Sequence, residues 1–126
     1  MIGKIGYGVT IGLFSLMMAG SGVAYLSGNE HLAALFRHLG YPDYFRTLLG
    51  VAKLVGVVAL LAPGMPAVLR EWAYAGFAIT MVAAAISHLA SGDPVGRVAA
   101  PLFALALLVT ARALWRTHGN SRGLRA

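Results

Sequence analysis

The chain has 126 residues, of which 59% are hydrophobic and 11% are charged. Soluble domains average about 45–50% apolar and about 25% charged residues, and a soluble domain this short cannot bury so much apolar surface. The composition therefore predicts a membrane protein, with one domain over residues 1–126. The absence of cysteine excludes thiol–disulfide chemistry, iron–sulfur ligation and thiolate zinc sites.

The net charge is +6, a sign that nucleic-acid-binding proteins and membrane proteins share. Its placement separates the two, because basic residues gather in the tail after Ala111, at the end of the last apolar segment. The tail contains Arg112, Arg116, Arg122 and Arg125. Such a cluster beside an apolar segment is typical of membrane topology. We therefore expect a lipid bilayer around the chain and no nucleic-acid partner.

Four apolar segments are long enough to cross the hydrocarbon layer, which needs about 20 helical residues. They cover residues 5–26, 44–62, 72–90 and 95–115. The fold class predicted from them is all-α, a four-helix transmembrane bundle.

The first segment repeats small residues four positions apart, in three pairs: Gly8 and Gly12, Ser15 and Ala19, and Gly20 and Ala24. Small residues at this spacing let membrane helices approach closely. The pattern favours packing inside the bundle, and it leaves a homo-oligomer as the alternative.

The connection between the first two segments has apolar residues at helical spacing: Leu32, Leu35, Phe36 and Leu39. This spacing predicts a short amphipathic helix, which ends at Gly40 because Pro42 prevents its continuation. Two roles are open for it. It lies at the membrane interface, or it forms a lid over a cavity in the bundle.

Lys53 lies near the middle of the second apolar segment. A charge at the bilayer centre costs roughly 3 kcal/mol, so such a residue is a functional-site hypothesis by default. Arg46 precedes it by seven residues and shares its helix face. Lys53 has three candidate roles: an ion pair with Glu71 on the neighbouring antiparallel span, a ligand or proton site, or an extended side chain that reaches the interface. The ion pair is favoured.

The third segment places Tyr74, Met81 and His88 on one face at intervals of seven residues. The spans contain no second histidine to face His88, which disfavours haem or metal ligation. His31 and His38 join His88 only if the first connection folds inward. The candidate pocket residues are Lys53, Glu71, Tyr74, His88 and Arg46, and no metal ligands are assigned.

The positive-inside rule orients the four spans. An even number of spans places both termini on one side, with six basic residues: Lys4, Arg70, Arg112, Arg116, Arg122 and Arg125. The other side has three: Arg37, Arg46 and Arg97. The excess predicts that the N and C termini are cytoplasmic.

Several motifs together resemble those of the DoxX-like family of small bacterial integral membrane proteins. They are Leu39-Gly40-Tyr41-Pro42, Gly50 through Lys53-Leu54, Arg70-Glu71-Trp72-Ala73-Tyr74-Ala75-Gly76-Phe77, and Ser87-His88-Leu89 followed by Gly92-Asp93. The resemblance implies a four-helix bundle in the bacterial inner (plasma) membrane. Relatives in the wider group include a membrane subunit of a thiosulfate:quinone oxidoreductase, which makes a quinone the candidate cofactor.

The sequence is compatible with three functions. The chain is an accessory or ligand-binding protein, with a polar pocket near Lys53 that takes a hydrophobic small molecule or contacts a partner membrane protein. Alternatively, it is a subunit of a quinone-linked oxidoreductase. The third is a small membrane enzyme with Lys53, Glu71, Tyr74 and His88 as acid–base groups. The first is favoured because no complete catalytic set is evident, and whether the chain is an enzyme stays open.

Overall fold

A computed structural model describes residues 2–123 of the chain, with side chains for residues 2–117. Its elements are α1 (Ile2–Leu26), α2 (Glu30–His38), α3 (Asp43–Leu61), α4 (Ala67–Ala90) and α5 (Val95–Gly123). Within the described residues, α1, α3, α4 and the Val95–Thr117 part of α5 are long and apolar enough to cross a membrane. The all-α fold predicted from the sequence is confirmed.

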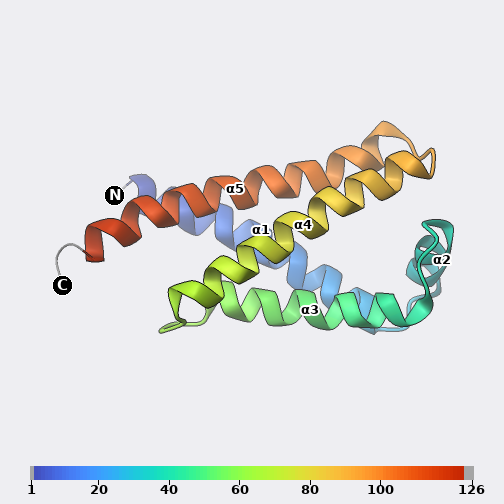
Figure 1. The fold of residues 1–126 in the computed structure, drawn as a ribbon, viewed down its shortest axis with the longest axis horizontal. Helices are drawn as coiled ribbons and strands as arrows, with labels where there is room; N and C mark the ends of the chain where they lie inside the picture. The colour runs from blue at the N-terminus through green and yellow to red at the C-terminus, as the bar shows by residue number, and fades with distance from the viewer. Residues whose placement is uncertain (1, 124–126) are drawn as a thin grey trace.

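The long helices run alternately up and down (Figure 1). The start of α1, the end of α5 and the α3–α4 connection lie at one end of the molecule, which we call the terminal end. Helix α2 and the α4–α5 connection lie at the other, the α2 end. Helix α1 contacts α3 and α5, and α4 contacts the same two helices. Towards the α2 end, α3 diverges from α4 and α5.

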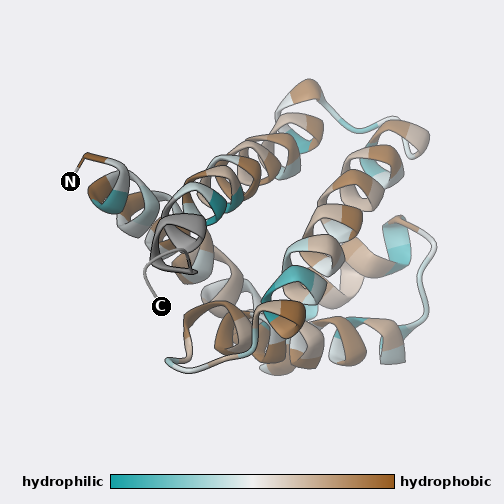
Figure 2. Ribbon diagram, turned by 60° about the vertical axis from the view of Figure 1, so that its left-hand side comes forward, coloured by the Kyte–Doolittle hydropathy of each residue, from teal (hydrophilic) through white to brown (hydrophobic). Residues whose placement is uncertain are grey.

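The bundle has a compact apolar core whose largest fully buried side chains are Phe14, Leu60 and Leu108. Phe14 and Phe77 meet edge to face, with ring centroids 5.0 Å apart, a favourable aromatic geometry. Large apolar side chains also cover the outside of the helices, for example Leu16 and Ile79, and Figure 2 shows hydrophobic residues along their length. An apolar core and an apolar exterior together fit a bundle surrounded by lipid.

Helices α1 and α3 cross most closely at Gly22 and Gly50. A Cβ atom added to either glycine would lie 3.1 Å from the backbone oxygen of the other, so a larger residue at either position would push the two backbones apart. Gly8, Gly12 and Gly20 instead have no such atom within 4 Å. The expectation that these three pack inside the bundle is therefore wrong. The side of α1 that carries Gly22 faces α3, and Gly8, Gly12 and Gly20 lie on its outer side.

Helix α2 forms where the amphipathic pattern predicted it. The Asn29 side chain accepts a hydrogen bond of 2.9 Å from the His31 backbone N–H and caps its first turn. Gly40 ends it with a φ of +86°, a conformation that glycine adopts without strain. The Phe36 ring faces the Tyr25 ring edge-on at 5.1 Å. The helix thus lies against the end of α1.

Candidate functional site

An open cavity of about 650 Å³ lies at the α2 end of the bundle. All five helices and the α4–α5 connection contribute to its lining. Its apolar wall includes Met17, Met18, Leu35, Met81 and Ala104, and its polar lining includes Ser21, Lys53, His88, Asp93 and Arg97. Volumes of about 300–1,000 Å³ with apolar walls and few polar groups are typical of small-molecule sites.

Lys53 reaches this cavity from the middle of α3. Its side chain is buried, and Nζ donates a 2.7 Å hydrogen bond to Ser21 Oγ on α1. Nζ also lies 4.1 Å from the centre of the Tyr25 ring, within range of a cation–π interaction. None of the ion pairs formed by the described residues includes Lys53. Its charge is therefore offset by a hydroxyl and an aromatic ring alone.

Glu71 pairs with a different cation from the one expected. Its Oε2 accepts hydrogen bonds from Nε and Nη2 of Arg112 on α5, at 3.1 and 2.9 Å. The predicted Lys53–Glu71 pair is absent because Glu71 lies near the terminal end of α4, whereas Lys53 extends towards Ser21. The positions of Lys53 and Glu71 along their own helices do not reveal that Arg112, on the fourth membrane span, lies beside Glu71.

A second polar group surrounds Asp93 in the α4–α5 connection. Its Oδ2 lies 2.6 Å from His88 Nδ1, and its Oδ1 lies 2.7 Å from His38 Nε2. The hydrogen bonds from His88 and His38 lower the pKa of the Asp93 carboxyl below its usual range. The ionised carboxylate accepts only, so both imidazoles donate an N–H to it.

Exposure increases along this group from the cavity outward. The Asp93 and His88 side chains are 7% and 13% exposed, and that of His38 is 45% exposed. A second bond joins the same segments, because Tyr41 Oη lies 2.5 Å from Ser87 Oγ. The first connection therefore folds inward over the bundle end and places His38 beside His88's carboxylate partner. Among the residues described, no set of three metal-binding side chains is arranged to hold an ion.

A family model described as the DoxX-like family matches residues 9–111. The chain belongs to the DoxX-like family. No curated protein and no solved structure matches it. Together with the four apolar helices, the family establishes a small multi-pass membrane protein.

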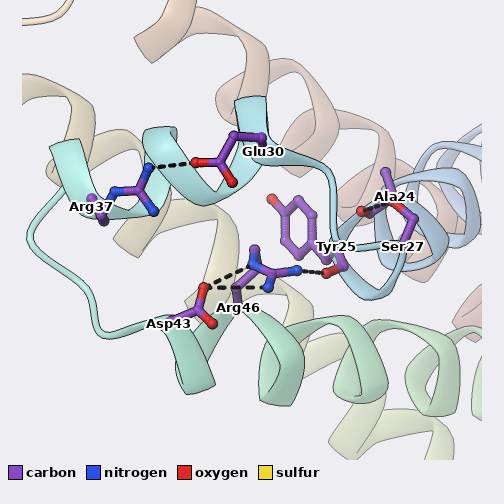
Figure 3. A network of polar contacts seen from close by, with 7 residues as sticks. All are labelled: Ala24, Tyr25, Ser27, Glu30, Arg37, Asp43 and Arg46. Carbon is purple, nitrogen blue, oxygen red and sulfur yellow. Dashed lines mark hydrogen bonds and ion pairs between the residues drawn. The ribbon is translucent and has the colours of Figure 1, made fainter.

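Two other predicted site residues of this DoxX-like protein lie outside the cavity lining. Arg46 is buried on the same side of α3 as Lys53, but its guanidinium donates to the Tyr25 carbonyl and to Asp43 Oδ1 (Figure 3). It thereby satisfies a carbonyl at the end of α1. Tyr74 is buried near the terminal end, where its ring stacks on Trp115 at 5.5 Å.

The structure adds site residues that the sequence analysis did not select: Ser21, Tyr25, His38, Asp93 and Arg97. Asp93 had a local signal, since it follows His88 by five residues across the turn at Gly92. The turn returns the Asp93 N–H to the His88 carbonyl at 3.0 Å. His38 was expected to join His88 only if the first connection folds inward, which it does, through their shared Asp93. Ser21 had no local signal, because it reaches the cavity only through the tertiary fold.

Proposed function

We propose that this DoxX-like protein binds a lipophilic molecule with an oxygen-bearing head group in the cavity, and that Lys53 donates to that head. The proposal rests on the buried Lys53, which lines the cavity and has no carboxylate partner among the described residues. A lysine ammonium has three N–H donors, and Ser21 accepts from one. A ligand oxygen would offset the cost of burying the charge.

The walls support a ligand that is otherwise apolar. Met17, Met18 and Met81 line the same cavity, and methionine side chains adapt to irregular apolar shapes and contact aromatic rings favourably. A molecule that partitions into the bilayer would be concentrated beside the bundle. The role proposed is binding or handing on such a molecule, as an accessory protein does.

The test is native mass spectrometry of the protein purified in mild detergent, with extraction and identification of any molecule that remains bound. We expect the wild type to retain a lipophilic molecule and Lys53→Met to lose most of it. Lys4→Met is the matched control, because Lys4 is exposed at the far end of α1. Ser21→Ala keeps the lysine and should weaken retention less. Equal retention by wild type and Lys53→Met, or none by wild type, would contradict the proposal.

The oxidoreductase alternative is decided by the same extract. A quinone carbonyl is an acceptor that Lys53 Nζ could bind, and the resemblance to quinone-linked relatives supports trying it first. If the chain is a subunit of such an enzyme, the extracted molecule is a quinone and its partner protein supplies the electrons. An extracted molecule without a redox-active ring would remove this alternative.

We further propose that the protein lies in a bacterial inner membrane with the terminal end in the cytoplasm. The described basic residues at that end, Lys4, Arg70, Arg112 and Arg116, support this orientation, while Arg122 and Arg125 lie outside the described side chains. The chain has no cysteine, so single cysteines can report sidedness. In intact spheroplasts, an impermeant thiol reagent should label Arg37→Cys and reach Lys4→Cys only after lysis. The reverse pattern would overturn the orientation.

A further inference from the structure

We infer that His88 is the acid–base residue of the cavity, and that it takes a proton from a phenol-type hydroxyl on the bound molecule. The inference rests on the proposed function and deepens it, because it assigns the ligand a chemical class. It also gives a role to Asp93 and to the two histidines bonded to it, His88 and His38. These three residues take no part when Lys53 binds the head of the ligand.

The geometry prepares one nitrogen of His88 to accept a proton. Asp93 Oδ2 takes the Nδ1–H at 2.6 Å, which fixes the tautomer and leaves the lone pair on Nε2. The His88 side chain is only 13% exposed and lines the cavity. A buried carboxylate that orients a histidine in this way also stabilises the imidazolium that forms when the ring accepts a proton.

His38 positions this pair. Its Nε2–H donates to the second oxygen of Asp93 at 2.7 Å, so the carboxylate is held from both sides. Because His38 lies at the end of α2, the orientation of His88 depends on α2 being folded over the cavity. His38 is therefore a positioning residue, whereas His88 contacts the ligand.

The proton transfer needs no other reactant. The O–H bond of the ligand breaks, its proton binds His88 Nε2, and the electron pair stays on the ligand oxygen. The products are a phenolate-type anion and an imidazolium beside the Asp93 carboxylate. Release of the neutral ligand returns the proton, so the residue is unchanged after each cycle.

The charges that face the cavity favour the anionic form of the ligand. Lys53 from α3 and Arg97 from α5 are its cations, Asp93 is the carboxylate among its described lining, and Tyr25, His31 and His38 are its other titratable groups. Arg97 pairs with Asp93 at 3.8 Å, which leaves the Lys53 ammonium as the cation without a carboxylate partner among the described lining.

The ligand class follows from which hydroxyl needs a base in order to ionise at neutral pH. A carboxylic acid ionises near pH 4 without help, and a phenol hydroxyl ionises near pH 10. A base in the cavity therefore changes the charge of the second kind of group at neutral pH, when a cation stabilises the anion. The methionines of the wall suit an aromatic ring.

The test uses an alkyl-substituted nitrophenol, whose phenolate is coloured, with protein in a nonionic detergent. Equilibrium dialysis measures binding, and absorbance measures the phenolate-to-phenol ratio of the bound probe at constant pH. We expect wild type to raise this ratio at least tenfold over empty micelles. His88→Gln should abolish the increase while the probe still binds, and Asp93→Asn should remove most of it. Asp43→Asn is the matched control, since Asp43 pairs with Arg46 outside the cavity.

The outcomes separate this inference from the proposed function. If wild type binds the probe and leaves its ratio unchanged, or if His88→Gln keeps the increase, the acid–base role is wrong and binding stands. If wild type retains a natural molecule but not the probe, the phenol class is wrong. If it retains neither, both proposals fail. Should His88→Gln not fold, as judged by thermal melting, the comparison of Asp93→Asn with Asp43→Asn decides.

Discussion

The two ends of the bundle contain similar residue types and use them differently. At the terminal end, Glu71 has its cation in Arg112 and Tyr74 stacks on Trp115. At the α2 end, Lys53 has no carboxylate partner among the described residues, and Asp93 is shared by two histidines and Arg97 beside a cavity. Charges that neutralise each other across two helices hold those helices together. Glu71 and Arg112 line a smaller cavity of about 280 Å³ but already neutralise each other, whereas Lys53 faces the larger cavity without a carboxylate partner among the described residues. From this difference we propose that the α2 end binds the ligand.

The largest expected effect concerns the scaffold of the α2 end. Gly50→Leu forces a side chain against the Gly22 backbone and Leu26, which a Cβ alone would approach to 3.1 and 3.0 Å. Overpacking of this kind costs about 1–3 kcal/mol. Unfolding in mixed detergent micelles measures it, with Gly20→Leu as a control that gains the same helix propensity on an open face. Equal stabilities would show that the α1–α3 crossing is loose and that the cavity has no rigid wall.

The next effect concerns the ion pair at the terminal end. In a double-mutant cycle, Glu71→Gln and Arg112→Met should couple by about 1 kcal/mol, because each removes the same charged hydrogen bonds. The cycle of Lys53→Met with Glu71→Gln should be additive within about 0.5 kcal/mol. Both cycles use unfolding free energies in the same detergent. Coupling in the second cycle but not in the first would restore the pair expected from the sequence and reverse the contrast between the two ends.

The smallest effect is local to α2 and depends on pH. The pKa of Asp93 is lowered by its hydrogen bonds with His88 and His38. Its contribution to stability is therefore present at neutral pH and is lost as the pH falls through the lowered folded-state pKa. Relative to α3, amide hydrogen exchange in α2 should therefore accelerate in acid.

At pH 7, Asp93→Asn should reproduce this acceleration and Asp43→Asn should not. Exchange in α2 that is the same for wild type and Asp93→Asn would mean that the Asp93 group does not fasten α2 over the cavity.

The sequence was sufficient for the architecture because apolar length and helical spacing are local signals. The four spans and α2 follow from them, although α4 begins at Ala67 rather than at Trp72. The rotation of each helix was harder to predict. Small residues at Gly8 and Gly12 resembled an interface, yet Gly22 and Gly50 form it, because the chain's own pattern does not say which face meets a neighbour.

The site could be predicted only in part for the same reason. Lys53 was evident because a charge within a span is costly, and His88 was evident from its helix face. The hydroxyl that accepts from Lys53 was not evident, since Ser21 comes from another helix. Nor was it evident that His38 shares Asp93 with His88, since His38 lies on α2 and approaches only after folding. Depth alone favoured Glu71 as the partner of Lys53, and depth does not reveal that Arg112 on α5 is closer to that carboxylate.

The most direct test of the account compares one cation from each end of the bundle. Native mass spectrometry of Lys53→Met and Arg112→Met, each purified like the wild type, measures how much of the co-purifying molecule each variant retains. The account predicts that Lys53→Met loses most of it and that Arg112→Met, although less stable, keeps it. Retention by Lys53→Met at the wild-type level, or equal loss from both variants, would contradict the claim that the α2 end is the binding site.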